Sequence, residues 1–400
     1  MTRTADYTIQ GFLYQFNKTV LEILAAQDDD TITIEGVVED IEVSNTTSTR
    51  AIQCKYHETH TSFSESAIYK PLLQMLKHYH DNSTADVRYV LFAHFQGVKE
   101  PYPNVDKSTL QSALGSRDQT LKKHIMAIPT TVNLDAFIKR FEMKFGPTYD
   151  VLSKDVVNAL KTNGFPEDDI EILAYPNAIH KVATFSIKHS QSERQTTKKE
   201  FLEELKAIRT TAISRWTLAL KSRDKVLIAR RKQLKAHLDK NSRLRYFAID
   251  LGSIVDYKDD IVLFIKNYLD KYHFKPAHTH TPVMCLRADH ATIQQIKHRL
   301  YKKGILVTDG YIGPEFEAAH FFRDPLVAKE VGGTPKREFS LRILSWDHCR
   351  HMNNRKCDDV FIIGDLDISP LDTKDVNVER LAGATVKEVE FILGISNVYE

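Results

Sequence analysis

Two short strand-like runs near the amino terminus carry the residues best suited to chemistry. Asp40 stands in the first run, residues 39–43, and Gln53 and Lys55 stand in the second, residues 50–57. Side chains alternate between the two faces of a strand, so Gln53 and Lys55 point the same way, and pairing the runs as a hairpin would bring Asp40 close to Lys55. We therefore expect a carboxylate, an amide and a lysine to converge on one patch.

Such a patch meets the needs of metal-assisted phosphodiester hydrolysis. A carboxylate can hold Mg²⁺ beside the scissile phosphate, and the ion lowers the pKa of a bound water. The lysine can orient that water and offset the charge that builds up on phosphorus. The side-chain oxygen of Gln53 is a hard ligand that Mg²⁺ accepts. A second carboxylate is also needed, and Glu35, Glu39 and Glu42 are the local candidates.

The same residues permit a second interpretation. Acidic and basic side chains on neighbouring strands are commonly a cross-strand ion pair on a solvated face. The surrounding elements decide between the two interpretations, because a catalytic patch needs a frame that holds it.

Hydrophobic periodicity and turn residues predict the helices and strands around the patch. Apolar spacings of three and four predict two helices, and short β-rich or continuous apolar runs predict four strands. In chain order the elements are a helix at 7–26, strands at 31–37, 39–43 and 50–57, a helix at 64–80 and a strand at 87–95. The order is α-β-β-β-α-β, which predicts an α/β core.

Three motifs in this frame resemble a known superfamily. They are Gly-Phe-Leu-Tyr-Gln at residues 11–15, the acidic strand with Glu39 and Asp40, and Gln53-Cys54-Lys55. Together they resemble the PD-(D/E)XK nucleases, and in particular the Mrr-like branch, whose last motif is Gln-x-Lys. The order of motifs is most similar to the endonuclease domain of CD-NTase-associated antiphage effectors. Domains of this type also serve as the nuclease subunit of Lamassu and of HerA-coupled defence systems.

The resemblance implies a restriction-endonuclease-like core that cleaves double-stranded DNA with Mg²⁺, or with Mn²⁺ as a substitute. It implies catalytic roles for Asp40, Gln53 and Lys55, with Gln15 supporting from the first helix and Glu35 nearby. Asp40, Gln53 and Glu39 are the expected metal ligands. By analogy the partners are other subunits of a defence complex, such as an SMC-like ATPase or a HerA-type translocase. The rival hypothesis is a non-catalytic nucleic-acid-binding or scaffold subunit that keeps the nuclease-like fold.

The rest of the chain divides at changes of pattern. Predicted helices at 106–125 and 133–145 precede Gly146-Pro147, so we expect a nuclease domain at 1–150. Residues 151–245 read as a predominantly helical basic region, and residues 246–400 as an α/β or α+β domain for partners and assembly. With no sensor motif evident, we expect an oligomer that another protein switches on.

Positive charge is concentrated in one window of this chain. Residues 198–245 hold 15 basic and 5 acidic residues, although the whole chain carries a net charge of only +2. We expect Arg230, Arg231, Lys232 and Lys235 to follow a DNA phosphate backbone. A solvated helical face, or a face that meets an acidic partner, is the alternative.

The remaining composition limits the class of protein. Hydrophobic residues make up 42% and charged residues 27% of 400 residues, and no apolar run is long enough to span a membrane. Four cysteines do not form a disulfide framework, and the amino terminus does not resemble a secretion signal, so we expect a cytoplasmic protein. The cluster of His348, Cys349, His351 and Cys357 matches no common zinc spacing.

Overall fold

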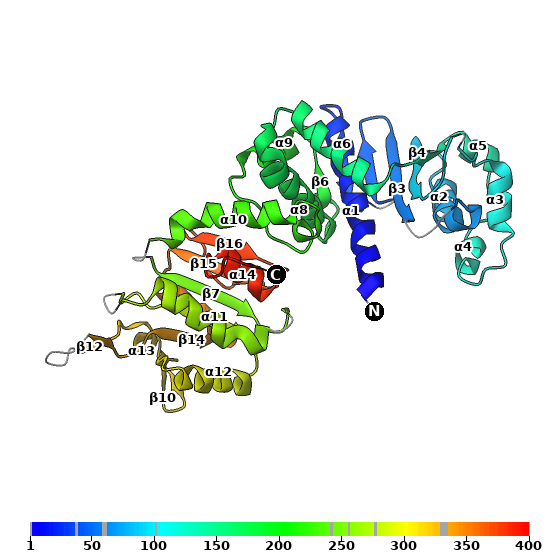
Figure 1. Ribbon diagram of the computed structural model, residues 1–400. Helices are drawn as coiled ribbons and strands as arrows, with labels where there is room; N and C mark the ends of the chain where they lie inside the picture. The colour runs from blue at the N-terminus through cyan, green and yellow to red at the C-terminus, as the bar shows by residue number, and fades with distance from the viewer. Residues whose placement is uncertain are drawn as a thin grey trace. The chain divides into compact units, whose positions relative to one another are not determined.

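The computed structural model describes residues 2–36, 39–57, 62–100, 102–240, 243–254, 257–275, 278–328 and 335–399. The chain forms two compact units, Met1–Arg209 and Thr210–Glu400, which are described separately (Figure 1). This division differs from the boundaries expected near residues 150 and 245. Most of the expected helical region packs within the first unit, and its last helix packs within the second.

The first unit opens with the expected order of elements. They are α1 (Thr2–Ala25), β1 (Thr31–Ile34), β2 (Ile41–Ser44), β3 (Thr49–His57), η1 (Glu65–Ile68), α2 (Tyr69–Asp81) and β4 (Val87–Phe95). The strands belong to a sheet of order β5-β4-β3-β2-β1-β6, in which β1, β2 and β3 are antiparallel neighbours. Strand β4 then pairs with β3 in parallel. The mixed α/β class predicted from the sequence is confirmed.

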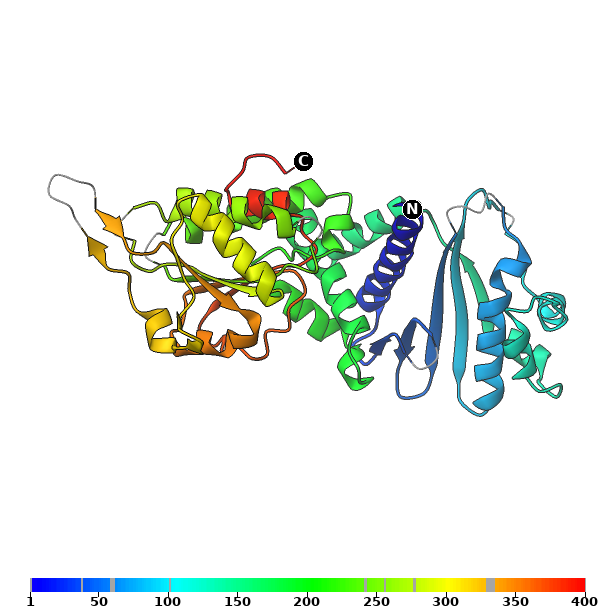
Figure 2. The ribbon, with the colours of Figure 1, turned by 90° about the horizontal axis from the view of Figure 1, so that it is seen from below.

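Helices cover both faces of this sheet (Figure 2). On one face Tyr14 of α1 stacks on Tyr56 of β3, with ring centroids 4.7 Å apart. On the other face α2 buries Leu72 and Leu76 in one core with Leu91 of β4. Alternation along β3 therefore gives Gln53 and Lys55 the α2 face and Cys54 the α1 face.

The helix expected at 133–145 is wrong in its second half. Helix α5 (Leu134–Ile138) ends early, and β5 (Phe141–Phe145) joins the sheet parallel to β4. Half-buried Phe141 and Phe145 alternate with exposed Glu142 and Lys144, a period of two that favours a strand. The helix expected at 106–125 is likewise two helices, α3 (Lys107–Leu114) and α4 (Lys122–Met126).

A helical layer completes the first unit. Its elements are α6 (Tyr149–Thr162), α7 (Glu167–Asp169), η2 (Ile170–Ala174), α8 (Tyr175–Ser186), η3 (Ser192–Arg194), β6 (Gln195–Thr196) and α9 (Lys198–Ala207). Helices α6 and α8 pack against α1. At one buried contact, the Tyr175 hydroxyl donates to Asn17 Oδ1 at 2.9 Å. This layer keeps residues 149–207 with the amino-terminal core.

The second unit contains a six-stranded parallel sheet of order β16-β15-β7-β8-β14-β9. Its elements are η4 (Thr217–Ala219), α10 (Arg223–Leu238), β7 (Arg245–Asp250), α11 (Tyr257–Tyr272), β8 (Val283–Arg287), α12 (His290–Lys302), β9 (Val307–Thr308), β10 (Tyr311–Ile312), β11 (Glu315–Phe316), α13 (Ala318–Phe322), β12 (Val327–Ala328), β13 (Lys336–Arg337), β14 (Leu341–Ser345), η5 (Trp346–Asn354), β15 (Asp359–Ile363), β16 (Asn377–Leu381) and α14 (Val386–Ile392). Apolar side chains of α10, α11, α12 and α14 share one core with the central strands. No helix among the described residues is long and apolar enough to cross a membrane.

Candidate functional site

The register of β2 and β3 brings the three predicted residues together. Ile41 pairs with Ile52, so Asp40, which immediately precedes β2, lies beside Gln53. Asp40 Oδ2 accepts a hydrogen bond from the Cys54 backbone N–H at 2.8 Å, which holds the carboxylate against β3. Lys55 stands two residues beyond Gln53 on the same face. The patch expected from strand alternation is present.

The turn between β1 and β2 places two further carboxylates at the patch. The Glu35 N–H donates to the Asp40 carbonyl at 2.8 Å, and the Gly36 N–H donates to the Glu39 carbonyl at 2.9 Å. A side chain at Gly36 would displace the Glu42 carboxylate, because a Cβ there would lie 2.2 Å from it. Val37 and Val38 lie outside the described residues.

Gln15 of α1 also reaches the patch. Its Nε2 donates to Glu35 Oε1 at 2.7 Å, and the Gln15 side chain is buried. This hydrogen bond joins α1 to the β1–β2 turn, which fits the supporting role expected of Gln15. Gln15, Glu35, Asp40, Gln53 and Lys55 therefore lie in one neighbourhood.

Burial raises the pKa of three carboxyl groups at the patch. Burial, and then the charge of Asp40, raise the pKa of Glu35 above its ordinary value and raise the pKa of Glu39 to about 8. Burial also raises the pKa of Asp40. The ammonium of Lys55 opposes all three shifts, so it lies near all three carboxyl groups. A cation bound at the patch would favour the charged form of these carboxyl groups, as Lys55 does.

One buried atom fits the expected metal. Gln53 Oε1 is inaccessible to solvent and finds no hydrogen-bond donor among the described residues. Leaving such an oxygen unpaired costs about 1–3 kcal/mol, and an ion would satisfy it. The described residues contain no group of three or more His, Cys, Asp or Glu side chains placed to hold a metal. Mg²⁺ does not require one, because it keeps several waters and binds through one or two carboxylates.

The structure corrects the predicted DNA surface at two of its four residues. Arg230 is only 4% exposed and forms an ion pair with buried Glu379. Arg231 donates to the Ser396 carbonyl at 3.0 Å and to Asn397 Oδ1 at 2.7 Å. Both guanidinium groups lie on the side of α10 that packs against the rest of the second unit. Lys232 and Lys235 are exposed, and their contact with DNA stays a prediction.

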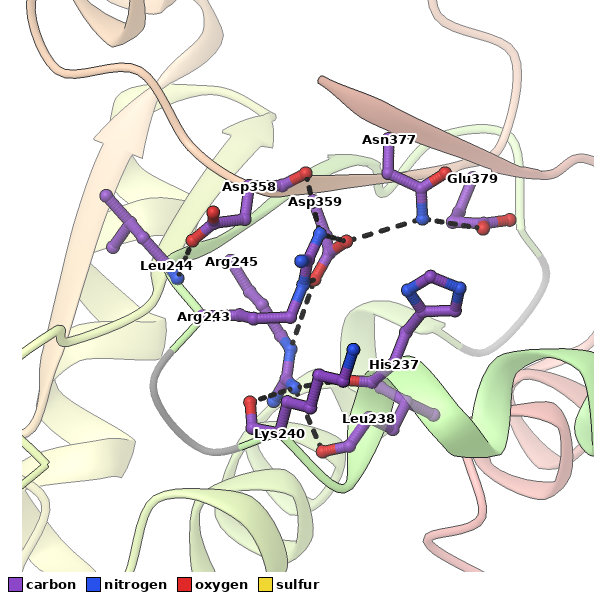
Figure 3. Close-up of polar contacts among 10 residues, drawn as sticks. All are labelled: His237, Leu238, Lys240, Arg243, Leu244, Arg245, Asp358, Asp359, Asn377 and Glu379. Carbon is purple, nitrogen blue, oxygen red and sulfur yellow. Dashed lines mark hydrogen bonds and ion pairs between the residues drawn. The ribbon is translucent and has the colours of Figure 1, made fainter. Parts of the chain in front are cut away.

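Two more arginines of the basic window are also bound internally, as Figure 3 shows. Arg243 donates to both carboxylate oxygens of Asp359, at 2.7 and 2.5 Å. Arg245 Nη2 donates to the carbonyls of His237, Leu238 and Lys240 at 2.7 to 2.9 Å, which caps the end of α10. The window therefore presents a weaker positive field to solvent than its composition suggests.

One arginine at the patch was not predicted from the sequence. The Arg194 guanidinium donates to the Glu35 carbonyl, and its charge lowers the pKa of Glu35. The two residues are 159 positions apart, so no local pattern could pair them. The short strand β6, which was not expected either, pairs with β1 and places Arg194 at the turn.

Comparison with known proteins adds little to this geometry. No family model and no curated protein matches the sequence. Among solved structures, the chain is weakly similar to the Cap4 SAVED/CARF-domain containing receptor of Moraxella osloensis. The sequences are 9% identical and the TM-score is 0.23, over 93% of this chain and 82% of that one. A TM-score of this size does not establish a shared fold.

Proposed function

We propose that the chain is a Mg²⁺-dependent endonuclease that hydrolyses phosphodiester bonds of double-stranded DNA. The core at the amino terminus would be the restriction-endonuclease-like fold that its motifs resemble. The observation that carries the proposal is the convergence of Asp40, Gln53 and Lys55 at the β2–β3 hairpin. Within this group the Gln53 side-chain oxygen is buried and has no donor among the described residues, and the pKa values of Asp40 and of neighbouring Glu39 are raised.

The residues would divide the work as follows. Asp40 and Gln53 would hold the ion, with Glu39 or Glu35 supplying a further oxygen. The ion would activate a water and polarise the scissile phosphate. Lys55 would orient the attacking water and offset the charge on phosphorus in the transition state. Gln15 would keep Glu35 in place through its 2.7 Å hydrogen bond.

The wider role follows from the resemblance and not from contacts in the structure. We propose an effector subunit of a multi-subunit antiphage system, activated by an SMC-like ATPase or a HerA-type translocase. The parallel sheet of the second unit would provide surfaces for partners and assembly. The lysines Lys232 and Lys235 of α10 would contribute to DNA affinity.

A plasmid-cleavage assay tests the proposal. The full chain is assayed with Mg²⁺ and with EDTA, alone and after co-purification with its genomic neighbours. Asp40→Asn keeps an oxygen that can accept from the Cys54 N–H but removes the charge, so we expect it to fold and to lose cleavage. Asp106→Asn is the matched control, because Asp106 also accepts backbone N–H bonds, at the start of α3.

Cleavage that needs Mg²⁺ and Asp40 would support the nuclease. If the complex binds DNA but neither wild type nor variant cuts it, the chain is instead a scaffold with a nuclease-like fold.

A further inference from the structure

The turn that carries Glu35 is held in an unfavourable conformation. Glu35 has a φ of 50°, in the left-handed region that costs a non-glycine residue about 1–2 kcal/mol. Strained residues of this kind persist only where surrounding contacts fix them, and they gather at functional sites. The conformation of Glu35 therefore depends on the groups that hold it.

Three hydrogen bonds within the described part of the chain hold Glu35. Two come from the amino-terminal core, and the third comes from a residue far along the chain. The backbone of Asp40 and the side chain of Gln15 hold the N–H and the carboxylate of Glu35. Its carbonyl accepts a hydrogen bond from Arg194 Nη1. Arg194 thus fixes the polar group of Glu35 that neither Asp40 nor Gln15 holds.

A short segment delivers Arg194 to this position. We call residues 192–196, which form η3 and β6, the η3–β6 strap. Thr196 pairs with Ile32 and Gln195 with Thr33, which adds the strap to the edge of the sheet beside β1. Strand β6 ends after two residues because Thr197 and Glu200 form a capping box that starts α9. Arg194 immediately precedes this short pairing, which places it at the turn.

The contact is not explained by stability alone. Arg194 Nε is inaccessible to solvent and has no acceptor among the described residues, which costs about 1–3 kcal/mol. A strained Glu35 and an orphaned Arg194 donor thus lie together beside Asp40 and Lys55. Both unfavourable features stand at the candidate site.

We propose that Arg194 is a positioning residue for this site, and that it acts by fixing the Glu35 turn. It would act through the backbone of the turn from which Glu35 and Glu39 project, and not by binding the ion itself. The inference rests on the proposed metal site. Groups that orient metal ligands typically contribute 10–100-fold to metal affinity or activity.

Manganese binding to the full chain, measured by titration calorimetry, tests the assignment without relying on cleavage. We compare wild type with Arg194→Met, Arg194→Lys and Arg140→Met. Arg140 is the matched control, because it is a half-buried arginine of the same unit that donates to a backbone carbonyl, that of Ala85, at the amino end of β5. Thermal unfolding of each variant is recorded in EDTA.

We expect Arg194→Met to weaken Mn²⁺ binding about tenfold or more, and Arg194→Lys, which keeps a donor, to stay within about threefold of wild type. Arg140→Met should bind Mn²⁺ normally. Where cleavage is measurable, Arg194→Met should lower kcat with little change in KM for DNA.

Normal Mn²⁺ affinity in Arg194→Met would overturn the assignment. So would losses of equal size in Arg194→Met and Arg140→Met, or no recovery with lysine. If wild type binds Mn²⁺ but cuts no DNA under any condition, the nuclease proposal fails while the role of Arg194 stands. If wild type binds no Mn²⁺, the positioning role falls as well.

Discussion

Lys55 is the residue on which the interpretation of the patch turns. An exposed cross-strand ion pair would join Lys55 to one carboxylate. Its charge instead opposes the upward pKa shifts of Glu35, Glu39 and Asp40 together. A lysine shared among three partly buried carboxyl groups resembles a catalytic cluster more than a surface pair. The distinction can be tested by removing the ammonium.

We predict that Lys55→Ala reduces the cleavage rate about 10²–10³-fold and leaves folding and DNA binding largely intact. The lysine acts mainly on charge that develops in the transition state. Plasmid cleavage and gel-shift measurements check both parts, with exposed Lys123→Ala as the control. A wild-type rate in Lys55→Ala would show that another residue does the chemistry.

Glu39 predicts a pH dependence of stability in the absence of metal. Its pKa of about 8 in the fold lies above the value of about 4.3 in an unfolded chain, because burial penalises the charge. The protonated form is the one the fold favours. This contribution is therefore complete below about pH 4.3 and is lost as pH rises through 8.

Glu39→Gln removes that loss, so the variant should gain on wild type as pH rises. At about 1.4 kcal/mol per pKa unit we expect the difference in unfolding free energy to grow by about 2–5 kcal/mol between pH 5 and pH 9. Urea unfolding in EDTA measures it, with exposed Glu142→Gln as the control. Parallel pH profiles for wild type and Glu39→Gln would contradict the prediction.

For single residues, the sequence predicted which side chains share one face of the β2–β3 hairpin, because strand alternation and short spacing determine this. Gln53 and Lys55 share a face because they are two residues apart on one strand, and Asp40 follows from hairpin pairing. Arg194 could not be predicted, because it lies 159 positions from Glu35 and is placed there by the two-residue strand that follows it. The burial of Arg230 was equally hidden, since its partner Glu379 lies on a strand that the sequence did not reveal.

Helix α10 carries basic residues of two kinds, one buried in an ion pair and others exposed to solvent. Val226 and Leu234 bury one side of the helix in the second core, and Arg230 lies on that side beside Glu379. Lys232 and Lys235 stay accessible to solvent. Composition alone therefore cannot tell which basic residues of a helix are buried and which face solvent.

We predict that the double variant Lys232→Glu, Lys235→Glu weakens binding to DNA of any sequence. The slope of log binding constant against log salt concentration should fall in magnitude by about 0.9 for each phosphate that is no longer neutralised.

Arg230→Met should instead destabilise the fold by about 3–5 kcal/mol, because it leaves Glu379 buried without a counter-charge. Fluorescence anisotropy at several salt concentrations and urea unfolding separate the two effects. If the lysine variant keeps its slope but no longer retains a protein partner in pull-down, α10 is an assembly surface.

Elements with a strong period were predictable, and short edge elements were not. The α-β-β-β-α-β order and the bounds of β4 match the expectation, because long apolar runs and helical spacing mark them. Strand β5 was read as the end of a helix, since five residues carry too little periodicity to oppose the helical run before them. Strand β6 depends on β1 for its existence, so local sequence could not reveal it.

The whole molecule consists of a unit with a mixed sheet, which carries the candidate site, and a parallel α/β unit. A nuclease with its lysine and carboxylates in place endangers its own host, so restraint is expected. We predict that the isolated chain cleaves plasmid slowly or not at all and gains activity on assembly with its partners. Light scattering and Mg²⁺-dependent cleavage at micromolar concentration test this, and rapid cleavage by a stable monomer would refute control by assembly.

The position of a bound ion tests the proposed metal site most directly, because it does not depend on activation. Crystals of the full chain are soaked with Mn²⁺, and the ion is located by its anomalous scattering. We predict one strong peak within coordination distance of Asp40 and Gln53 Oε1, with Glu39 or Glu35 as a further ligand, and no such peak in Asp40→Asn. An empty patch at saturating Mn²⁺, or an ion bound only elsewhere, would contradict the metal-dependent site on which the proposed nuclease rests.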